Sequence, residues 1–113
     1  MSVKIKRIYE PSDKADGLRV LVDRLWPRGV RKADAHVDVW LREVAPSDEL
    51  RRWFGHEPER WDEFRVRYGA ELDGNAAFAE LRGLARGPTT LLYSAKDEAH
   101  NQAVVLAERL KAG

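Results

Sequence analysis

The sequence predicts an α/β fold: a single small domain in which a mostly parallel sheet of about four strands has helices packed on both faces. Three observations lead to this prediction. Strand-like and helix-like segments mix along a chain of 113 residues, which is the length of one domain. The strand-like residues 89–95 run directly into an amphipathic segment, the order expected in a parallel sheet. No repeat, low-complexity tract or linker divides the chain, so residues 1–113 are assigned to one domain.

Three segments in the first part of the chain have the pattern of strands. In residues 3–9, Val3 and Ile5 alternate with lysines, as in a strand with one buried face. The apolar residues 18–22 are typical of a strand covered on both faces, and turn residues precede them. Apolar side chains alternate again in residues 37–41, which are predicted to form a third strand. These patterns do not reveal the order of the strands in the sheet.

The rest of the chain has mainly helical patterns. Ser47 is a good N-cap for a helix that Gly55 ends. Pro58 opens a second helix, in which large apolar side chains recur at helical spacing. A third helix ends before Gly87-Pro88, and the last helix is expected from about residue 98 to residue 111, after the strand at residues 89–95.

The composition argues against several classes of protein. Lysine and arginine total 20 and aspartate and glutamate 19, so the net charge of +1 argues against a general nucleic-acid binder. The absence of cysteine excludes disulfides, thiolate catalysis and cysteine-based zinc sites. His36, His56 and His100 lack metal-ligand spacing, and no phosphate-loop or dinucleotide fingerprint is present, so neither a metal nor another cofactor is predicted. No apolar segment has the length of a signal peptide or membrane span, which makes the cytoplasm the expected location.

The loop expected after the second strand carries the first group of candidate site residues. Arg24 and Arg28 offer planar sets of donors that fit carboxylate or phosphate oxygens in pairs. Gly29 permits the close approach of a ligand or a positive backbone dihedral. Trp26 is suited to stacking on a ring, although a place in the core is the favoured role for this residue alone. The candidate ligand-binding residues of this loop are Arg24, Trp26, Arg28, Gly29 and Lys32.

The second group lies at the junction expected between the last strand and the last helix. Asp97 is predicted to cap that helix, whose first amides would form an anion site together with Lys96. His100 follows Asp97 by three residues and is a candidate proton carrier on the same side of the helix. In the simpler interpretation Asp97 only caps the helix, and its neighbours are solvated. The candidate ligand-binding residues here are Ser94, Lys96, Asp97 and Asn101.

Both groups are expected at the carboxyl ends of strands, where parallel sheets bind ligands. If the two strands are neighbours, the two groups form one pocket. We therefore predict binding of an anionic or phosphorylated, nucleotide-like small molecule. Whether a reaction is catalysed stays open; transfer or hydrolysis assisted by His100 or Asp23 is the form to test. A structural role for Asp23, as the partner of Arg24 or Arg28, is favoured over a catalytic one.

Two other functions remain alternatives. The same basic, aromatic loop suits a non-enzymatic module that binds RNA or a protein, and RNA binding would use an open stripe of cations. That stripe would include Arg51, Arg52, Arg65 and Arg67. A third interpretation treats the loop as a purely architectural cluster of Arg–Asp pairs. No membrane partner is predicted, nucleic acid is not favoured, and a monomer and a homodimer are equally compatible with the sequence.

Several motifs resemble those of the YeaO-like family, a domain of unknown function (family 488). They are RVLVDRLWPRG at residues 19–29, the Ala45-Pro-Ser47 turn, LRRWF at residues 50–54, and LLYSAKD at residues 91–97 with Asn101. They follow the order of the family and cover nearly the whole chain. The resemblance implies a small cytoplasmic α/β protein of bacteria or archaea and no particular activity. More distant relatives carry cysteines near the last strand–helix junction, where this chain has Ser94 and His100-Asn101, so a thiol mechanism does not transfer.

Overall fold

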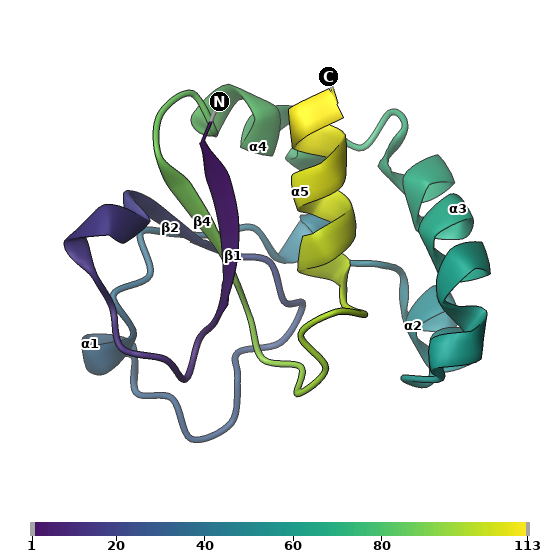
Figure 1. The fold of residues 1–113 in the computed structure, drawn as a ribbon, viewed down its shortest axis with the longest axis horizontal. Coiled ribbons are helices and arrows are strands. Elements are labelled where there is room, and N and C mark those ends of the chain that lie inside the picture. Colours follow the sequence, from purple (N-terminus) through teal and green to yellow (C-terminus); the bar gives the residue numbers. More distant parts are fainter. Residues whose placement is uncertain (1, 113) are drawn as a thin grey trace.

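Four parallel strands form the centre of the structure (Figure 1), a computed structural model that describes residues 2–112. Their order across the sheet is β1-β4-β2-β3, and every neighbouring pair is parallel. The predicted α/β class with a parallel four-stranded sheet is therefore confirmed. The strands are β1 (Val3–Arg7), β2 (Leu18–Leu21), β3 (Val39–Trp40) and β4 (Thr89–Tyr93). The helices are α1 (Lys32–Ala35), α2 (Asp48–Phe54), α3 (Trp61–Leu72), α4 (Ala76–Leu84) and α5 (Gln102–Ala112), and short 3-10 turns are η1 (Lys14–Asp16), η2 (Arg42–Val44) and η3 (Pro58–Arg60).

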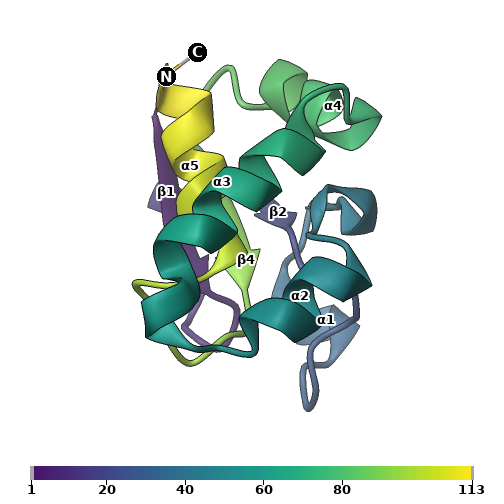
Figure 2. The same ribbon diagram turned by 90° about the vertical axis from the view of Figure 1, so that its right-hand side faces the viewer.

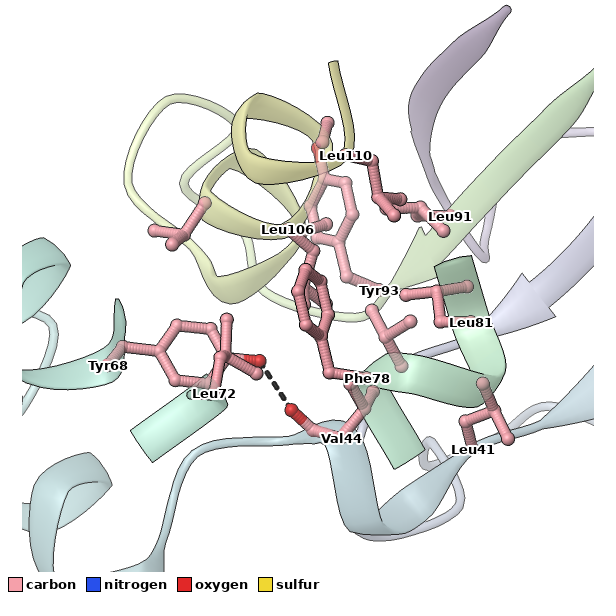
Figure 3. Close-up of a cluster of buried hydrophobic side chains, with 14 of the residues drawn as sticks. Leu41, Val44, Tyr68, Leu72, Phe78, Leu81, Leu91, Tyr93, Leu106 and Leu110 are labelled. Carbon is pink, nitrogen blue, oxygen red and sulfur yellow. Dashed lines mark hydrogen bonds between the residues drawn. The ribbon is translucent and has the colours of Figure 1, made fainter. Parts of the chain in front are cut away.

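Helices cover the two faces of the sheet unequally. On one face, Val20 and Leu91 belong to the large apolar core that α2, α3, α4 and α5 complete (Figure 2). Tyr68 of α3 lies in this core and donates a hydrogen bond to the carbonyl of Val44 (Figure 3). On the other face, Leu21 and Leu92 form a smaller cluster, which Ala35 of the short helix α1 covers. Successive residues of β2 and β4 thus face an apolar cluster on one side of the sheet or the other, which is why both faces of these strands are apolar.

The boundaries of α2 confirm the capping pattern in the sequence. Ser47 Oγ accepts a hydrogen bond from the Leu50 amide, and Gly55 adopts a left-handed conformation at the end of the helix, with φ +52°. Ser47 also donates a hydrogen bond to Glu71, which joins the start of α2 to α3. None of the helices within residues 2–112 has both the length and the apolar character needed to cross a membrane.

The predicted start of the last helix is wrong. The prediction placed it near residue 98 with Asp97 as its cap, whereas α5 begins at Gln102. Asn101 Oδ1 accepts the amide hydrogen bond of Val104 and is the capping side chain instead. Asp97 accepts from the amides of Ala99 and His100 and so closes a local turn. Both side chains are suited to capping, and the sequence alone did not distinguish between them.

Several other boundaries also differ from the predictions. The first strand ends at Arg7 rather than at residue 9, the second at Leu21 rather than at residue 22, and α3 begins at Trp61, after the 3-10 turn that Pro58 opens. The third strand is limited to Val39–Trp40, because only these residues pair with β2. The last strand ends at Tyr93 rather than at residue 95, so Ser94 and the residue after it are free to face a site. The single-turn helix α1 was not predicted, because four residues are too few to display helical periodicity.

A buried charge cluster lies at the opposite end of the sheet from these loops. The Asp16 side chain is fully buried and pairs with Arg19, with Lys6 Nζ at 3.1 Å and with Lys4 Nζ at 3.3 Å. Burial opposes ionisation of Asp16, but these hydrogen bonds outweigh it and hold the pKa of the carboxyl well below its usual range. The Asp16 carbonyl also accepts a hydrogen bond from Thr90 Oγ1 at 2.7 Å. The cluster thus joins β1, β2 and β4.

Candidate binding site

A cavity of about 370 Å³ lies at the carboxyl ends of β2 and β4, which are neighbours in the sheet. Its walls come from residues 23–28 after β2 and from residues 94–95 and 100–102 after β4. The two loops lie together below the sheet in Figure 1. The Ala45-Pro46 turn and side chains of α2 and α3 complete the wall. The condition set by the sequence analysis, that the two strands be adjacent, is met.

Burial divides the lining residues into an inner end and a rim. The buried part of the wall is called the inner end here, and it combines an ionisable group, Asp23, with the aromatic rings of Phe54 and Phe64. The other buried lining residues are Pro27, Ala45, Pro46 and Asn101. The rim consists of exposed side chains and is rich in cations. The rim residues are Tyr9, Leu25, Arg28, Arg51 and His56.

Asp23 connects the three segments that meet at the inner end. Its Oδ2 accepts hydrogen bonds from Ser94 Oγ at 2.6 Å and from the Ser94 amide at 3.1 Å, and its Oδ1 accepts from Gln102 Nε2 at 2.6 Å. Its backbone carbonyl accepts from Trp40 Nε1 at 2.7 Å. Burial raises the pKa of the Asp23 carboxyl, although the bonds from Ser94 and Gln102 and the charge of Arg51 act in the opposite direction. The predicted pairing of this carboxylate with Arg24 or Arg28 is wrong, because its partners are Ser94, which follows β4, and Gln102 of α5.

Arg24 forms a wall of the cavity through its own contacts with the chain. One guanidinium nitrogen donates to the carbonyls of Ala45 and Pro46, at 3.1 and 3.2 Å. Glu43 lies at 3.7 Å and Asp48 at 3.9 Å. Arg24 Nε is buried and has no hydrogen bond within the described part of the chain, since the Asp48 distance is too long for one. Arg24 therefore holds the Ala45-Pro46 turn in place through one guanidinium nitrogen, and its buried Nε keeps a donor unused within residues 2–112.

The rim cations are less engaged. The Arg28 side chain is exposed, and within residues 2–112 its guanidinium has no ion pair or hydrogen bond. The Arg28 backbone carbonyl accepts a hydrogen bond from Tyr9 Oη at 3.0 Å. Arg51 pairs with Asp48 at 3.0 Å across the surface of α2. A pair of this kind is exposed and weak, so an incoming anion competes with it at little cost. His56 adopts a positive φ of 58° at the rim, next to the end of α2.

Trp26 belongs partly to the protein core, as the sequence analysis favoured for this residue. Its indole donates to the Val30 carbonyl at 2.7 Å and meets Trp40 edge to face at 5.4 Å. Lys32 lies over the Trp26 ring at 5.5 Å and is not part of the cavity wall. One part of Trp26 nevertheless lines the cavity.

The segment after β4 contributes His100 and Asn101 to the wall. His100 Nδ1 lies 2.9 Å from Asp97 Oδ2, and the ring contacts Trp61 edge to face at 5.2 Å. The hydrogen bond from His100 lowers the pKa of Asp97. Asn101 is buried; its amide donates to the Asp97 carbonyl and its oxygen caps α5, so both ends of the side chain are occupied.

The structure gathers some of the predicted site residues and leaves others outside. The cavity is lined by Asp23, Arg24, Trp26, Arg28, Ser94, His100 and Asn101. The residues outside its wall are Gly29, Lys32, Lys96 and Asp97. Gly29 has φ +74° and open space where a Cβ would lie, so its role is the turn and not close packing. Lys96 is exposed, and α5 begins too late for its first amides to combine with this lysine.

Several lining residues were missed, or were weighed without being included. Arg51 is predicted only as part of an RNA-binding stripe, and His56 is not among the predicted site residues, yet both line the cavity. Tyr9 follows β1, which pairs in parallel with β4, so the carboxyl ends of the two strands lie at the same edge of the sheet. This position is the signal that would have predicted Tyr9 in the cavity wall. Gln102 gave no signal, since its role depends on where α5 begins. Among residues 2–112, no three histidine or acidic side chains are grouped so as to hold a metal ion.

Comparison with known proteins gives a family and no activity. Rv3073c, an uncharacterised protein of Mycobacterium tuberculosis, is 50% identical over 109 residues, covering 96% of this chain and 92% of that protein. YeaO, an uncharacterised protein of Escherichia coli, is 45% identical over 113 residues, covering 98% of each. No solved structure matches the chain significantly. The family model described as "Inactive DUF488-N3 subclade" matches residues 2–113. With this match and the identity to YeaO over nearly its whole length, the chain belongs to the YeaO-like DUF488 family.

Proposed function

We propose that the protein binds an anionic, nucleotide-like small molecule in the cavity between β2, β4 and α2, in the cytoplasm. The observation that carries this proposal is that one cavity combines rim cations that are weakly paired, or unpaired within residues 2–112, with aromatic rings in its buried wall. Arg28 and Arg51 supply the charge at the rim, and Phe54 supplies an apolar wall. A volume of about 370 Å³ is in the range of small-molecule sites.

Binding without turnover is the form that the observations favour. The family model that the chain matches carries the description "inactive". His100 Nδ1 is within hydrogen-bond distance of Asp97, and Asp23 accepts hydrogen bonds from Ser94 and Gln102. Both candidate catalytic groups thus have structural partners. Within residues 2–112, these partners leave His100 Nε2 and one acceptor site of Asp23 open, so the description of the family model as inactive is what favours binding alone over transferase or hydrolase activity.

The RNA-binding alternative receives less support. Three of the four arginines in the expected stripe pair with acidic side chains: Arg51 with Asp48, Arg65 with Glu108, and Arg67 with Glu63. These pairs neutralise most of the local charge that would attract phosphates along a nucleic-acid strand. A surface of this kind does not favour an extended polyanion.

A ligand screen tests the proposal. Thermal unfolding is followed with inorganic phosphate, nucleoside 5′-monophosphates, sugar phosphates and dicarboxylates, because a compound that binds only the native state raises the melting temperature. We expect a phosphorylated compound to raise it. Replacing both rim arginines, Arg28→Ala with Arg51→Ala, should weaken that binding by about tenfold to a hundredfold for each charged hydrogen bond lost.

Arg65→Ala is the matched control, since it removes a paired arginine of α3 that does not line the cavity. It should leave the affinity unchanged. A phosphorylated compound that binds the double variant as tightly as the unaltered protein would contradict the site. Binding of single-stranded RNA that is tighter than binding of any small anion, and falls steeply with salt, would favour the alternative.

A further inference from the structure

We propose that Asp23 selects the ligand by accepting a hydrogen bond, so that the cavity takes a phosphorylated molecule whose far end carries N–H or O–H donors, as a nucleoside monophosphate does. This inference rests on the proposed anion binding. It adds a second recognition element, a buried acceptor, to the exposed arginines of the rim.

Hydrogen-bond counting shows that Asp23 has unused capacity. An ionised carboxylate has about four acceptor sites, and the described residues fill three of them. Ser94 donates twice to Oδ2, through its amide and its hydroxyl, and Gln102 donates once to Oδ1. The remaining acceptor site is therefore on Oδ1, in a residue that lines the cavity.

Gln102 adds a second acceptor beside this site. An ionised carboxylate only accepts hydrogen bonds, so the Gln102 amide must direct its NH₂ group at Asp23. Its Oε1 accepts no hydrogen bond from any of the described residues, and Gln102 also lines the cavity. Two hydrogen-bonded residues of the cavity wall, Asp23 and Gln102, thus each keep an acceptor that the described residues leave open, which suits paired donors such as those of a nucleobase edge or a sugar diol.

The burial of Asp23 means that a hydrogen-bond donor of a ligand would stabilise its carboxylate. The residue is only 8% exposed, and a buried carboxylate is costly unless it is paired or hydrogen-bonded. No arginine or lysine forms an ion pair with it within residues 2–112, since Arg24 is directed at the Ala45-Pro46 turn. A donor supplied by a ligand satisfies the open acceptor in surroundings where water is a poor competitor.

The charges of the lining residues determine how an anionic ligand is oriented in the cavity. Asp23 repels an anion at the inner end, while Arg28 and Arg51 attract one at the rim. A ligand therefore binds with its phosphate towards the rim and its donor group towards Asp23, and its ring packs against the wall that the stacked Phe54 and Phe64 rings form. A dicarboxylate has a negative charge at both ends and is disfavoured. Bare phosphate reaches only the rim.

The test compares the affinities of three probes, measured by calorimetry: inorganic phosphate, phenyl phosphate and nucleoside 5′-monophosphates. Phenyl phosphate has a ring and an anion but no donor at its far end. In the unaltered protein, we expect at least one nucleoside monophosphate to bind about tenfold more tightly than phenyl phosphate, the effect of one hydrogen bond to a charged group. Equal affinities across the nucleoside monophosphates and phenyl phosphate would overturn the inference without any variant.

Asp23→Asn is the variant that tests the residue itself. The asparagine keeps the shape of the side chain, accepts from Ser94, and donates to Gln102 once that amide turns over, so its hydrogen bonds within the protein are kept. An NH₂ group then replaces the open acceptor. The affinity for the nucleoside monophosphate should fall about tenfold, to that of phenyl phosphate, while phenyl phosphate itself binds no more weakly. Asp73→Asn, which removes an exposed carboxylate outside the cavity, should change neither affinity.

The outcomes separate this inference from the proposed function. If none of the probes binds the unaltered protein, the proposed anion site is wrong and the selectivity inferred for Asp23 falls with it. If they bind and Arg51→Ala weakens all of them, but Asp23→Asn weakens none, the anion site stands and the role of Asp23 is wrong.

Discussion

At the scale of single residues, two buried aspartates show how different environments give one side chain different tasks. Asp16 is surrounded by Arg19, Lys6 and Lys4, and its pKa is lowered. Asp23 is hydrogen-bonded by neutral donors and has a raised pKa, with burial as the main cause. The first carboxylate stabilises the fold when ionised, whereas the second opposes folding when ionised. A group of the second kind is typical of a binding site, because stability alone does not require it.

Asp23→Asn should therefore leave the free energy of unfolding unchanged or raised at neutral pH. The folded state holds the Asp23 proton more tightly than the unfolded chain does, so the ionised carboxylate is destabilising at neutral pH. That destabilisation is relieved as the pH falls through the raised pKa towards the ordinary value. Urea unfolding at several pH values measures this. The advantage of the variant should shrink in acid, and a large loss of stability at neutral pH would contradict the assignment.

At the scale of elements, the start of α5 decides which side chains reach the cavity. Asn101 caps the helix, which leaves Gln102 in its first turn and directs its amide at Asp23. If α5 began at residue 98, the helix would include the turn that now brings His100 to the cavity wall. The turn closed by Asp97 therefore belongs to the architecture of the site, although Asp97 itself lies outside the wall.

Asn101→Ala should lower the free energy of unfolding by about 1 kcal/mol, the usual effect of losing a helix cap. The buried Asn101 amide also donates to the Asp97 carbonyl, so the turn loosens as well. Asn101→Asp keeps the capping oxygen and should restore most of the loss. Thermal or urea unfolding of the three proteins measures this order, and a larger effect from Asp97→Ala than from Asn101→Ala would show that the cap is misassigned.

At the scale of the whole molecule, the sheet separates stability from binding. Its amino end contains the charge cluster around Asp16, which joins β1, β2 and β4. Its carboxyl end contains the cavity. A change at one end can therefore alter stability while leaving the other end intact, and this separation makes the binding experiments interpretable.

Asp16→Asn should destabilise the protein by about 3 kcal/mol, because it leaves the buried Arg19 and the half-buried Lys6 without their partner. The contribution of Asp16 to stability changes with pH in the opposite direction to that of Asp23. A lowered pKa gives stability that is fully present above the ordinary aspartate value, near 4, and is lost as the pH falls towards the folded value. Acid unfolding of both proteins measures this. Stability of the unaltered protein that stays constant on acidification to pH 2 would contradict it.

Much of the local structure follows from short-range patterns. The Val3 and Ile5 alternation, the Ser47 cap with Gly55, and the apolar residues of β4 each predict an element that the structure contains. The two loops that the sequence singles out, after β2 and after β4, both line the cavity. Alternation, capping and turn chemistry act over a few residues, and so a single chain segment displays them.

Short-range patterns in the sequence were enough to predict the α/β class and the two loops that line the cavity. They did not predict that β4 lies beside β2, that Asn101 and not Asp97 caps α5, or that Arg24 holds a turn. The tertiary structure decided these features, and it also gave Asp23 its partners, Ser94 and Gln102, which lie 71 and 79 residues further along the chain. The reason is physical: these contacts form only when distant segments pack together, and packing decides which of several suitable side chains is buried, paired or left free for a ligand.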